Sequence, residues 1–307
     1  MKCSRSAKTA VTADKRADGF LPLLGGGPFH MACGQVTDDT EMAMGLARSL
    51  LGCRAFDLED VAKSYLAWYK SHPPDIGITT SQAFRTIADW EPVSAQMKDN
   101  AAKYNAGSLS NGCLMRISPL AIAGGGWSEE ELGRAAVADA SLTHSNPVAQ
   151  DAVRVFALAL RDLIRGAAPQ EVYQLAGQRA ETEQVSQILA SAAAPLGERQ
   201  AADGFLGNAL RLAFQHILQT EYLEQGLVSV MELGSDTDTN GAIVGAVLGA
   251  KLGADSVPGE WRRAVVEVKC KRLEAYAGVR LDELERVAEQ LLRISFSQDQ
   301  LLKSSCP

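Results

Sequence analysis

The sequence predicts an all-α protein that folds as one compact domain. Apolar residues recur with the helical period of 3.6 along most of the 307 residues, and 46% of the chain is apolar, enough for a sizeable core. Neither an alternating strand pattern of useful length nor a repeat of 20–50 residues is visible. The glycine-rich segments are short, so we predict loops there rather than linkers between domains.

The N-terminal half predicts helices with recognisable ends. Asp57 is a predicted N-cap, and the sequence His-Pro-Pro at 72–74 stops the helix that follows it. Ser128 and Glu131 have the spacing of a capping box, and three glycines at 124–126 break the apolar segment before them. The predicted helices cover 40–51, 58–71, 81–90, 94–104 and 128–140, with a buried apolar segment at 111–123.

The C-terminal half continues the helical pattern. Asn146 followed by Pro147 predicts a cap and a proline at the first helical position of a long amphipathic helix. Glycines at 241, 245, 249 and 253 lie four residues apart and predict a helix face that another helix approaches closely. The predicted helices cover 147–165, 169–180, 181–194, 205–219, 221–233, 238–252 and 281–294.

The net charge, the cysteines and the absence of long apolar runs limit the classes of protein to which this chain can belong. The formal net charge of −7 argues against a general nucleic-acid surface. The six cysteines stand singly, as is typical of reduced thiols in a cytosol, and no signal peptide or membrane span is visible. We therefore expect a cytoplasmic monomer that binds neither nucleic acid nor a membrane. Residues 1–18 are predicted to be a polar segment outside a domain that spans 19–307.

Two acidic clusters carry the functional information. Thr37-Asp38-Asp39-Thr40 precedes one predicted helix, and residues 234–240, Gly-Ser-Asp-Thr-Asp-Thr-Asn, precede another. Carboxylates and hydroxyls are the ligands that hard cations such as Mg²⁺ or Mn²⁺ prefer. For either cluster taken alone, helix capping is the better explanation. If both clusters converge, their carboxylates repel one another unless cations offset the charge, so convergence implies metal.

The chain resembles the ADP-ribosylglycohydrolase family, in particular the bacterial branch typified by the dinitrogenase-reductase-activating glycohydrolase. The resemblance covers roughly residues 20–260 and is carried by six motifs in the family's order. These motifs are Gly-Gly-Gly-Pro at 25–28, Gly-Gln-Val-Thr-Asp-Asp-Thr at 34–40, Pro-Asp-Ile-Gly at 74–77 with Thr79 and Thr80, Ser-Asn-Gly-Cys-Leu-Met-Arg at 110–116, Thr-His-Ser-Asn-Pro at 143–147, and 234–241.

The resemblance implies a single compact all-α domain of orthogonally packed helices. It also implies two Mg²⁺ or Mn²⁺ ions as cofactors and an ADP-ribosylated protein, modified on arginine, as substrate. The implied metal ligands are Thr37, Asp38, Asp39, Asp236, Asp238 and Thr239, with Asp38 or Asp39 as the catalytic base. The implied contacts to ADP-ribose are Asn111, Gly112, Met115, Arg116 and His144, and Ser235 and Asn240 are candidates to donate to a phosphate. For Met115 and Arg116 the alternative is helix packing and a structural ion pair, and for His144 it is capping of the next helix.

The sequence departs from the family in two places. The glutamate that family members carry in an N-terminal helix has no clear counterpart, and Thr12 would stand in its place. Ser108 or Ser110 replaces an acidic residue that often precedes Asn-Gly. Three functions therefore stay open: a hydrolase of ADP-ribosyl-arginine, a catalytically impaired binding, regulatory or partner-blocking protein, and a hydrolase of another ADP-ribosyl linkage.

Overall fold

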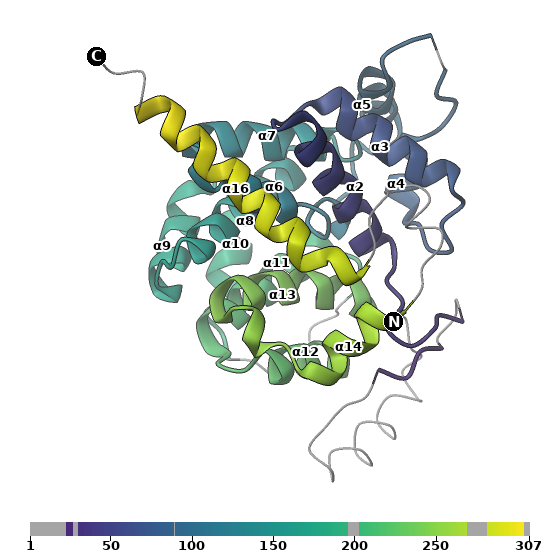
Figure 1. The fold of residues 1–307 in the computed structure, drawn as a ribbon. Helices are drawn as coiled ribbons and strands as arrows, with labels where there is room; N and C mark the ends of the chain where they lie inside the picture. Colours follow the sequence, from purple (N-terminus) through teal and green to yellow (C-terminus); the bar gives the residue numbers. More distant parts are fainter. Residues whose placement is uncertain (1–22, 27–29, 89, 196–202, 269–280, 304–307) are drawn as a thin grey trace.

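The protein is seen in a computed structural model that describes residues 23–26, 30–88, 90–195, 203–268 and 281–303 (Figure 1). This part of the chain is helical and holds no strand, only two isolated β-bridges, which confirms the all-α prediction. The α-helices are α2 (Asp38–Cys53), α3 (Leu58–Lys70), α4 (Ile78–Ala83), α5 (Val93–Tyr104), α6 (Ser118–Ala123), α7 (Glu129–Ser141), α8 (Pro147–Ile164), α9 (Pro169–Arg179), α10 (Glu183–Ser191), α11 (Leu206–Gln219), α12 (Leu223–Leu233), α13 (Thr237–Leu252), α14 (Gly259–Glu267) and α16 (Leu284–Lys303).

The helix packing brings distant parts of the sequence together. Helix α13 contacts α11 and α12, and also packs against α8 and α2. Helix α16 crosses the front of the molecule and contacts α6 and α2 (Figure 1). Because α2 and α13 each begin at one of the acidic clusters, their contact is the feature of the fold that positions the candidate site.

The predicted helix caps are confirmed. The Asp57 carboxylate accepts from the Asp60 amide at the start of α3. Ser128 and Glu131 form a reciprocal capping box on α7. The Asn146 side chain caps α8, and Pro147 occupies its first turn. These side chains satisfy amides that would otherwise lack a partner at a helix N-terminus.

One predicted helix has the wrong bounds, and one helix was not predicted. The helix expected at 81–90 is α4, which begins at Ile78 and ends at Ala83. The chain then turns through Thr86 at a positive φ of 48°, and the Asn100 amide binds the carbonyls of Ala83 and Arg85 in place of helical amides. Helix α14 was not expected, because its sequence, Gly-Glu-Trp-Arg-Arg-Ala-Val-Val-Glu, buries only Trp261.

The predicted close approach at the glycine stripe of α13 is also wrong. A methyl group added at Gly241 or Gly249 would meet no described atom within 4 Å, and at Gly245 the nearest is Leu227 Cδ2, at 3.7 Å. The packed face of α13 instead consists of buried β-branched and leucine side chains, namely Ile243, Val244, Val247 and Leu248.

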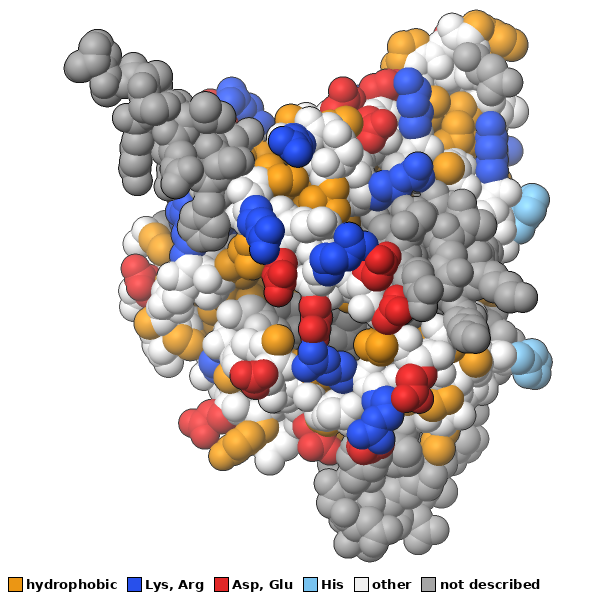
Figure 2. Space-filling model, viewed as in Figure 1, with side chains coloured by type: hydrophobic (Ala, Val, Ile, Leu, Met, Phe, Trp, Pro, Cys, Tyr) orange, Lys and Arg blue, Asp and Glu red, His pale blue; other side chains and the backbone are white. Residues whose placement is uncertain are grey.

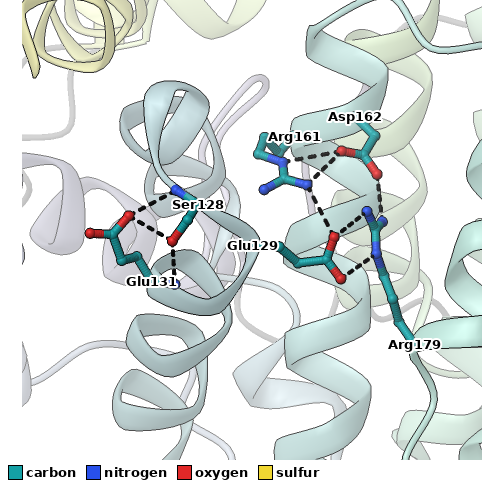
Figure 3. A network of polar contacts seen from close by, with 6 residues as sticks. All are labelled: Ser128, Glu129, Glu131, Arg161, Asp162 and Arg179. Carbon is teal, nitrogen blue, oxygen red and sulfur yellow. Dashed lines mark hydrogen bonds and ion pairs between the residues drawn. The ribbon is translucent and has the colours of Figure 1, made fainter. Parts of the chain in front are cut away.

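Ion pairs tie α7, α8 and the end of α9 to one another. Arg179 binds the Glu129 carboxylate through two nitrogens, at 2.9 and 2.8 Å, and also binds Asp162 (Figure 3). Arg161 contacts the other oxygen of Asp162 at 2.9 Å. Elsewhere, on the face crossed by α16, acidic and basic side chains are interspersed rather than segregated (Figure 2). None of the described helices has both the length and the apolarity that crossing a bilayer requires.

A fully buried polar group lies between the loop after η2 (Asn111–Cys113), α3 and α7. Arg116 Nε donates to Asp139 Oδ2 at 2.9 Å, and Tyr65 donates its hydroxyl proton to Asp139 Oδ1 at 2.7 Å. The guanidinium also lies 4.8 Å from the centre of the Tyr65 ring. Each of the three side chains is 0% exposed. Removing one partner of such a pair leaves an uncompensated charge in the core.

We expect Asp139→Ala to lower the free energy of unfolding by about 3–5 kcal/mol, because Arg116 would stay buried without its carboxylate. Chemical denaturation measures the loss. Arg134→Ala is the matched control, because its ion pair with Glu130 is exposed at 70% and 78% and contributes at most about 1 kcal/mol. Equal effects of the two variants would contradict this account of the core.

Candidate metal and substrate site

The two acidic clusters are not used as helix caps. Thr37 and Asp236 occupy the N-cap positions of α2 and α13, yet neither side chain accepts a hydrogen bond from its own helix. The Thr37 hydroxyl instead donates to Asp39 Oδ2 at 2.6 Å. Gly234 and Ser235 both have positive φ, 80° and 63°, and this sharp turn precedes Asp236. The capping explanation therefore does not account for these residues.

Asp39 lies where the two clusters meet. Its side chain is buried, with 3% of the residue exposed. Burial raises its pKa to about 7, and the negative charges of Asp238 and Asp236 act in the same direction. The hydroxyls of Thr37 and Thr239 oppose this increase. The first cluster is thus close enough to the second for their carboxylates to repel one another.

The donor set fits hard divalent cations. Oδ1 of Asp39 is buried without a hydrogen-bond partner among the described residues, although its companion oxygen has one. The nearby groups are carboxylates and hydroxyls, the ligand chemistry of Mg²⁺ and Mn²⁺. No three His, Cys, Asp or Glu side chains in the described ranges stand close enough to form a metal-binding group as they are.

Asn111 joins the second cluster to a distant loop. Its side-chain amide donates to Asp236 Oδ2 at 2.8 Å, across 125 residues of sequence. Its backbone amide donates to the carbonyl of Gly204, and Leu206 donates to Leu109. Asn111 was predicted as a contact to ADP-ribose, and the structure places it 5% exposed beside a predicted metal ligand.

His144 lies behind the Asn-Gly loop and is completely buried. Its Nε2 is 2.8 Å from the Ser110 hydroxyl and its Nδ1 is 2.7 Å from the Thr143 hydroxyl. Burial, reinforced by the positive charge of Arg116, lowers the pKa of His144 to about 3, so the ring is neutral at pH 7. The cap of α8 is Asn146 rather than His144. His144 therefore contacts Ser110 from within the core, and its own ring is not exposed at the surface.

The remaining predicted site residues differ in their exposure. Gly112 is buried, and a methyl group there would lie 3.4 Å from Thr80 Oγ1 and 3.6 Å from His144 Cε1. Met115 is 7% exposed, and Arg116 is 0% exposed in its pair with Asp139, as the structural alternative predicted. Ser235 is exposed and Asn240 is buried. Thr12 lies outside the described residues.

Two residues near the site were not expected from the sequence. Glu41 lies one turn along α2 from Asp38, is 0% exposed and accepts from the Trp68 indole at 2.8 Å. The acidic spacing from Asp38 to Glu41 could have indicated it. Gly204 lies beside Asn111 and Asp236, and no local sequence signal indicates that neighbourhood.

The fold and this site together define a class of glycosidases. A model of the ADP-ribosylglycohydrolase family matches residues 4–299, and the chain belongs to that family. It is 27% identical over 241 residues to the ADP-ribosyl-[dinitrogen reductase] glycohydrolase of Rhodospirillum rubrum, covering 78% of this chain and 76% of that protein. It is 24% identical over 251 residues to the ADP-ribosylarginine hydrolase Tri1 of Pseudomonas putida (78% and 64%).

A solved structure named as an ADP-ribosylglycohydrolase-related protein complex has the same fold. The TM-score is 0.73 at 29% identity, and the match covers 89% of this chain and 87% of the other. Proteins with different named substrates match at similar identity, so the chain is assigned to the family and not to the bacterial branch that its motifs suggested.

The raised pKa of Asp39 gives a prediction for the metal-free protein. An acid whose pKa is higher in the folded than in the unfolded state binds more protons when folded, so stability falls as the pH rises from about 4 to 7. We expect Asp39→Asn to remove this fall and to stabilise the metal-free protein at pH 8 by on the order of 1–3 kcal/mol.

Thermal unfolding in a chelating buffer between pH 5 and pH 8 measures the effect. Asp57→Asn, a change at an exposed cap of α3, is the control and should leave the pH dependence intact. If Asp39→Asn destabilises the metal-free protein at pH 8, the carboxyl is not held against the second cluster as described.

Proposed function

We propose that this protein hydrolyses the N-glycosidic bond between the distal ribose of ADP-ribose and an arginine side chain of a modified protein. The observation that carries the proposal is the burial of Asp39 against Asp236 and Asp238, in a chain that belongs to the ADP-ribosylglycohydrolase family. Family members act on ADP-ribosylated substrates and are typically metal-dependent.

Two Mg²⁺ or Mn²⁺ ions are proposed as cofactors. Thr37, Asp38 and Asp39 would hold them from the start of α2, and Asp236, Asp238 and Thr239 from the start of α13. When bound, such ions polarise oxygen ligands and lower the pKa of bound water. Their positive charge would also offset the repulsion between the carboxylates of the two clusters.

The chain's own residues provide a base for the reaction. Asp39, or Asp38 beside it, accepts a proton from the attacking water, whose oxygen bonds to C1″. The bond from C1″ to the guanidine nitrogen breaks, and that nitrogen takes up a proton from solvent, which balances the proton that the attacking water has lost. The N-termini of α2 and α13 add a partial positive charge that favours a phosphate nearby. Asn111, Gly112, Met115 and Ser235 remain the proposed lining of the ADP-ribose pocket. Arg116, His144 and Asn240 are 0% exposed, so we propose that they support this lining rather than contact ADP-ribose.

One observation favours the impaired binder as a second candidate. Where family members often carry an acid, Ser108 and Ser110 are engaged with neutral partners: Ser108 is 2.7 Å from the Thr79 hydroxyl, and Ser110 contacts His144. A carboxyl group that could protonate the leaving nitrogen is therefore missing from this loop. General acid catalysis contributes about 10²–10⁴-fold, so a protein without it could retain binding with little turnover.

We expect the purified protein with Mn²⁺ or Mg²⁺ to release ADP-ribose from an arginine-modified protein, and Asp236→Asn to lower this rate by at least about 100-fold. Release is followed by mass spectrometry, with a serine-modified protein as the comparison substrate. Glu224→Gln, at a partly exposed position in the first turn of α12, is the control for loss of a carboxylate away from the site.

Binding of ADP-ribose without release from either substrate would support the binder instead. Faster release from the serine-modified protein would reassign the linkage. If the wild type neither binds ADP-ribose nor releases it, the proposed function is wrong.

A further inference from the structure

We infer that Asn111 and Gly204 are positioning residues that fix the orientation of the Asp236 carboxylate as a metal ligand. This inference rests on the proposed function, because it assumes that Asp236 binds a cation. It gives Asn111 a role different from the direct ADP-ribose contact predicted from the sequence, and it adds Gly204 to the site.

The hydrogen bond from Asn111 fixes the rotation of Asp236. The Asn111 side-chain amide donates to Oδ2 at 2.8 Å, and Asn111 itself is 5% exposed. The Asp236 side chain makes no capping bond to α13. Partners of this kind that orient a ligating carboxylate contribute substantially to metal affinity.

Asn111 is itself held from two sides. Its backbone amide donates to the Gly204 carbonyl at 3.0 Å, and Leu206 donates to the Leu109 carbonyl at 2.8 Å, so residues 109–111 pair with 204–206. On the other side, Ser110 contacts the buried ring of His144 at 2.8 Å. The amide that reaches Asp236 thus comes from a loop with little freedom to move.

Gly204 provides the space for this contact. A methyl group at position 204 would lie 3.2 Å from Asp236 Oδ2 and 3.8 Å from Asn111 Oδ1. The first distance is tighter than ordinary van der Waals contact, so a side chain here would push the carboxylate away from its orientation. The two residues therefore act on the same oxygen of Asp236, one by a hydrogen bond and one by the absence of a side chain.

The experiment measures Mn²⁺ binding by titration calorimetry without ADP-ribose, for the wild type, Asn111→Ala and Gly204→Ala. We expect each variant to bind Mn²⁺ about 10–100-fold more weakly. Asp236→Asn, which removes the charge, should bind most weakly. Gly177→Ala is the matched control, because it adds a methyl group on exposed α9 with no described atom within 4 Å. Its affinity should equal that of the wild type.

Thermal unfolding of the metal-free variants separates positioning from a general structural role. A structural role would lower the melting temperature and leave Mn²⁺ affinity unchanged in the folded protein. If Asn111 is instead a direct ligand contact, Asn111→Ala weakens ADP-ribose binding at saturating Mn²⁺ but leaves Mn²⁺ affinity intact. Either result overturns the inference. Should Asn111→Ala fail to fold, Gly204→Ala alone decides, because it keeps the hydrogen-bonding groups.

These outcomes are distinct from failure of the proposed function. If the wild type and Asp236→Asn both fail to bind Mn²⁺, the metal-dependent mechanism and the positioning inference fall together. If the wild type binds Mn²⁺ and Asp236→Asn does not, while Asn111→Ala and Gly204→Ala bind as tightly as the wild type, only the positioning inference is overturned.

Discussion

The burial of the Asp39 carboxylate close to the carboxylates of Asp236 and Asp238 is the constraint on which the candidate site depends. Asp39 is almost fully enclosed, and its repulsion by Asp238 and Asp236 together with burial raises its pKa to about 7. Such an arrangement opposes folding, because burial and like charges both disfavour ionised acids. Proteins retain arrangements of this kind chiefly at functional sites, where a ligand offsets the unfavourable charge.

The fold brings the carboxylates together by packing α13 on α2. Each helix begins at its cluster without using the N-cap side chain for capping. The large buried faces of α8 and α11 supply much of the surrounding core, and the pair between Arg116 and Asp139 joins the loop after η2 to α7. That loop directly follows η2, which begins at Asn111, so the buried ion pair also helps to fix a residue that contacts Asp236.

Much of the fold follows from the sequence because its signals are local. The cap at Asp57, the capping box of Ser128 and Glu131, and the Asn146 cap with Pro147 depend on residues within one helical turn, and the structure contains all of them. Predictions about which helix faces pack against each other were less accurate. The glycine spacing of α13 shows that a close approach is sterically possible, but not whether another helix lies on that face.

The same difference between local signals and contacts of distant segments applies to the candidate site. The two acidic clusters could be recognised by composition, and the family motifs related them to each other. The bond from Asn111 to Asp236 joins residues 125 positions apart, and Gly204 is placed by packing against both, which no local pattern encodes. The burial of His144 was not predicted, and for Arg116 the sequence left a ligand contact and a structural ion pair open, because polar motif residues look alike in a sequence whether they face a ligand or the core.

The most direct test of the central claim is the anomalous diffraction signal at the manganese edge from crystals of the protein grown with Mn²⁺. The account predicts two strong peaks between the start of α2 and the start of α13, within coordinating distance of oxygens of both Asp39 and Asp238. Crystals that show manganese only elsewhere, or only at one of the two helix starts, would contradict it.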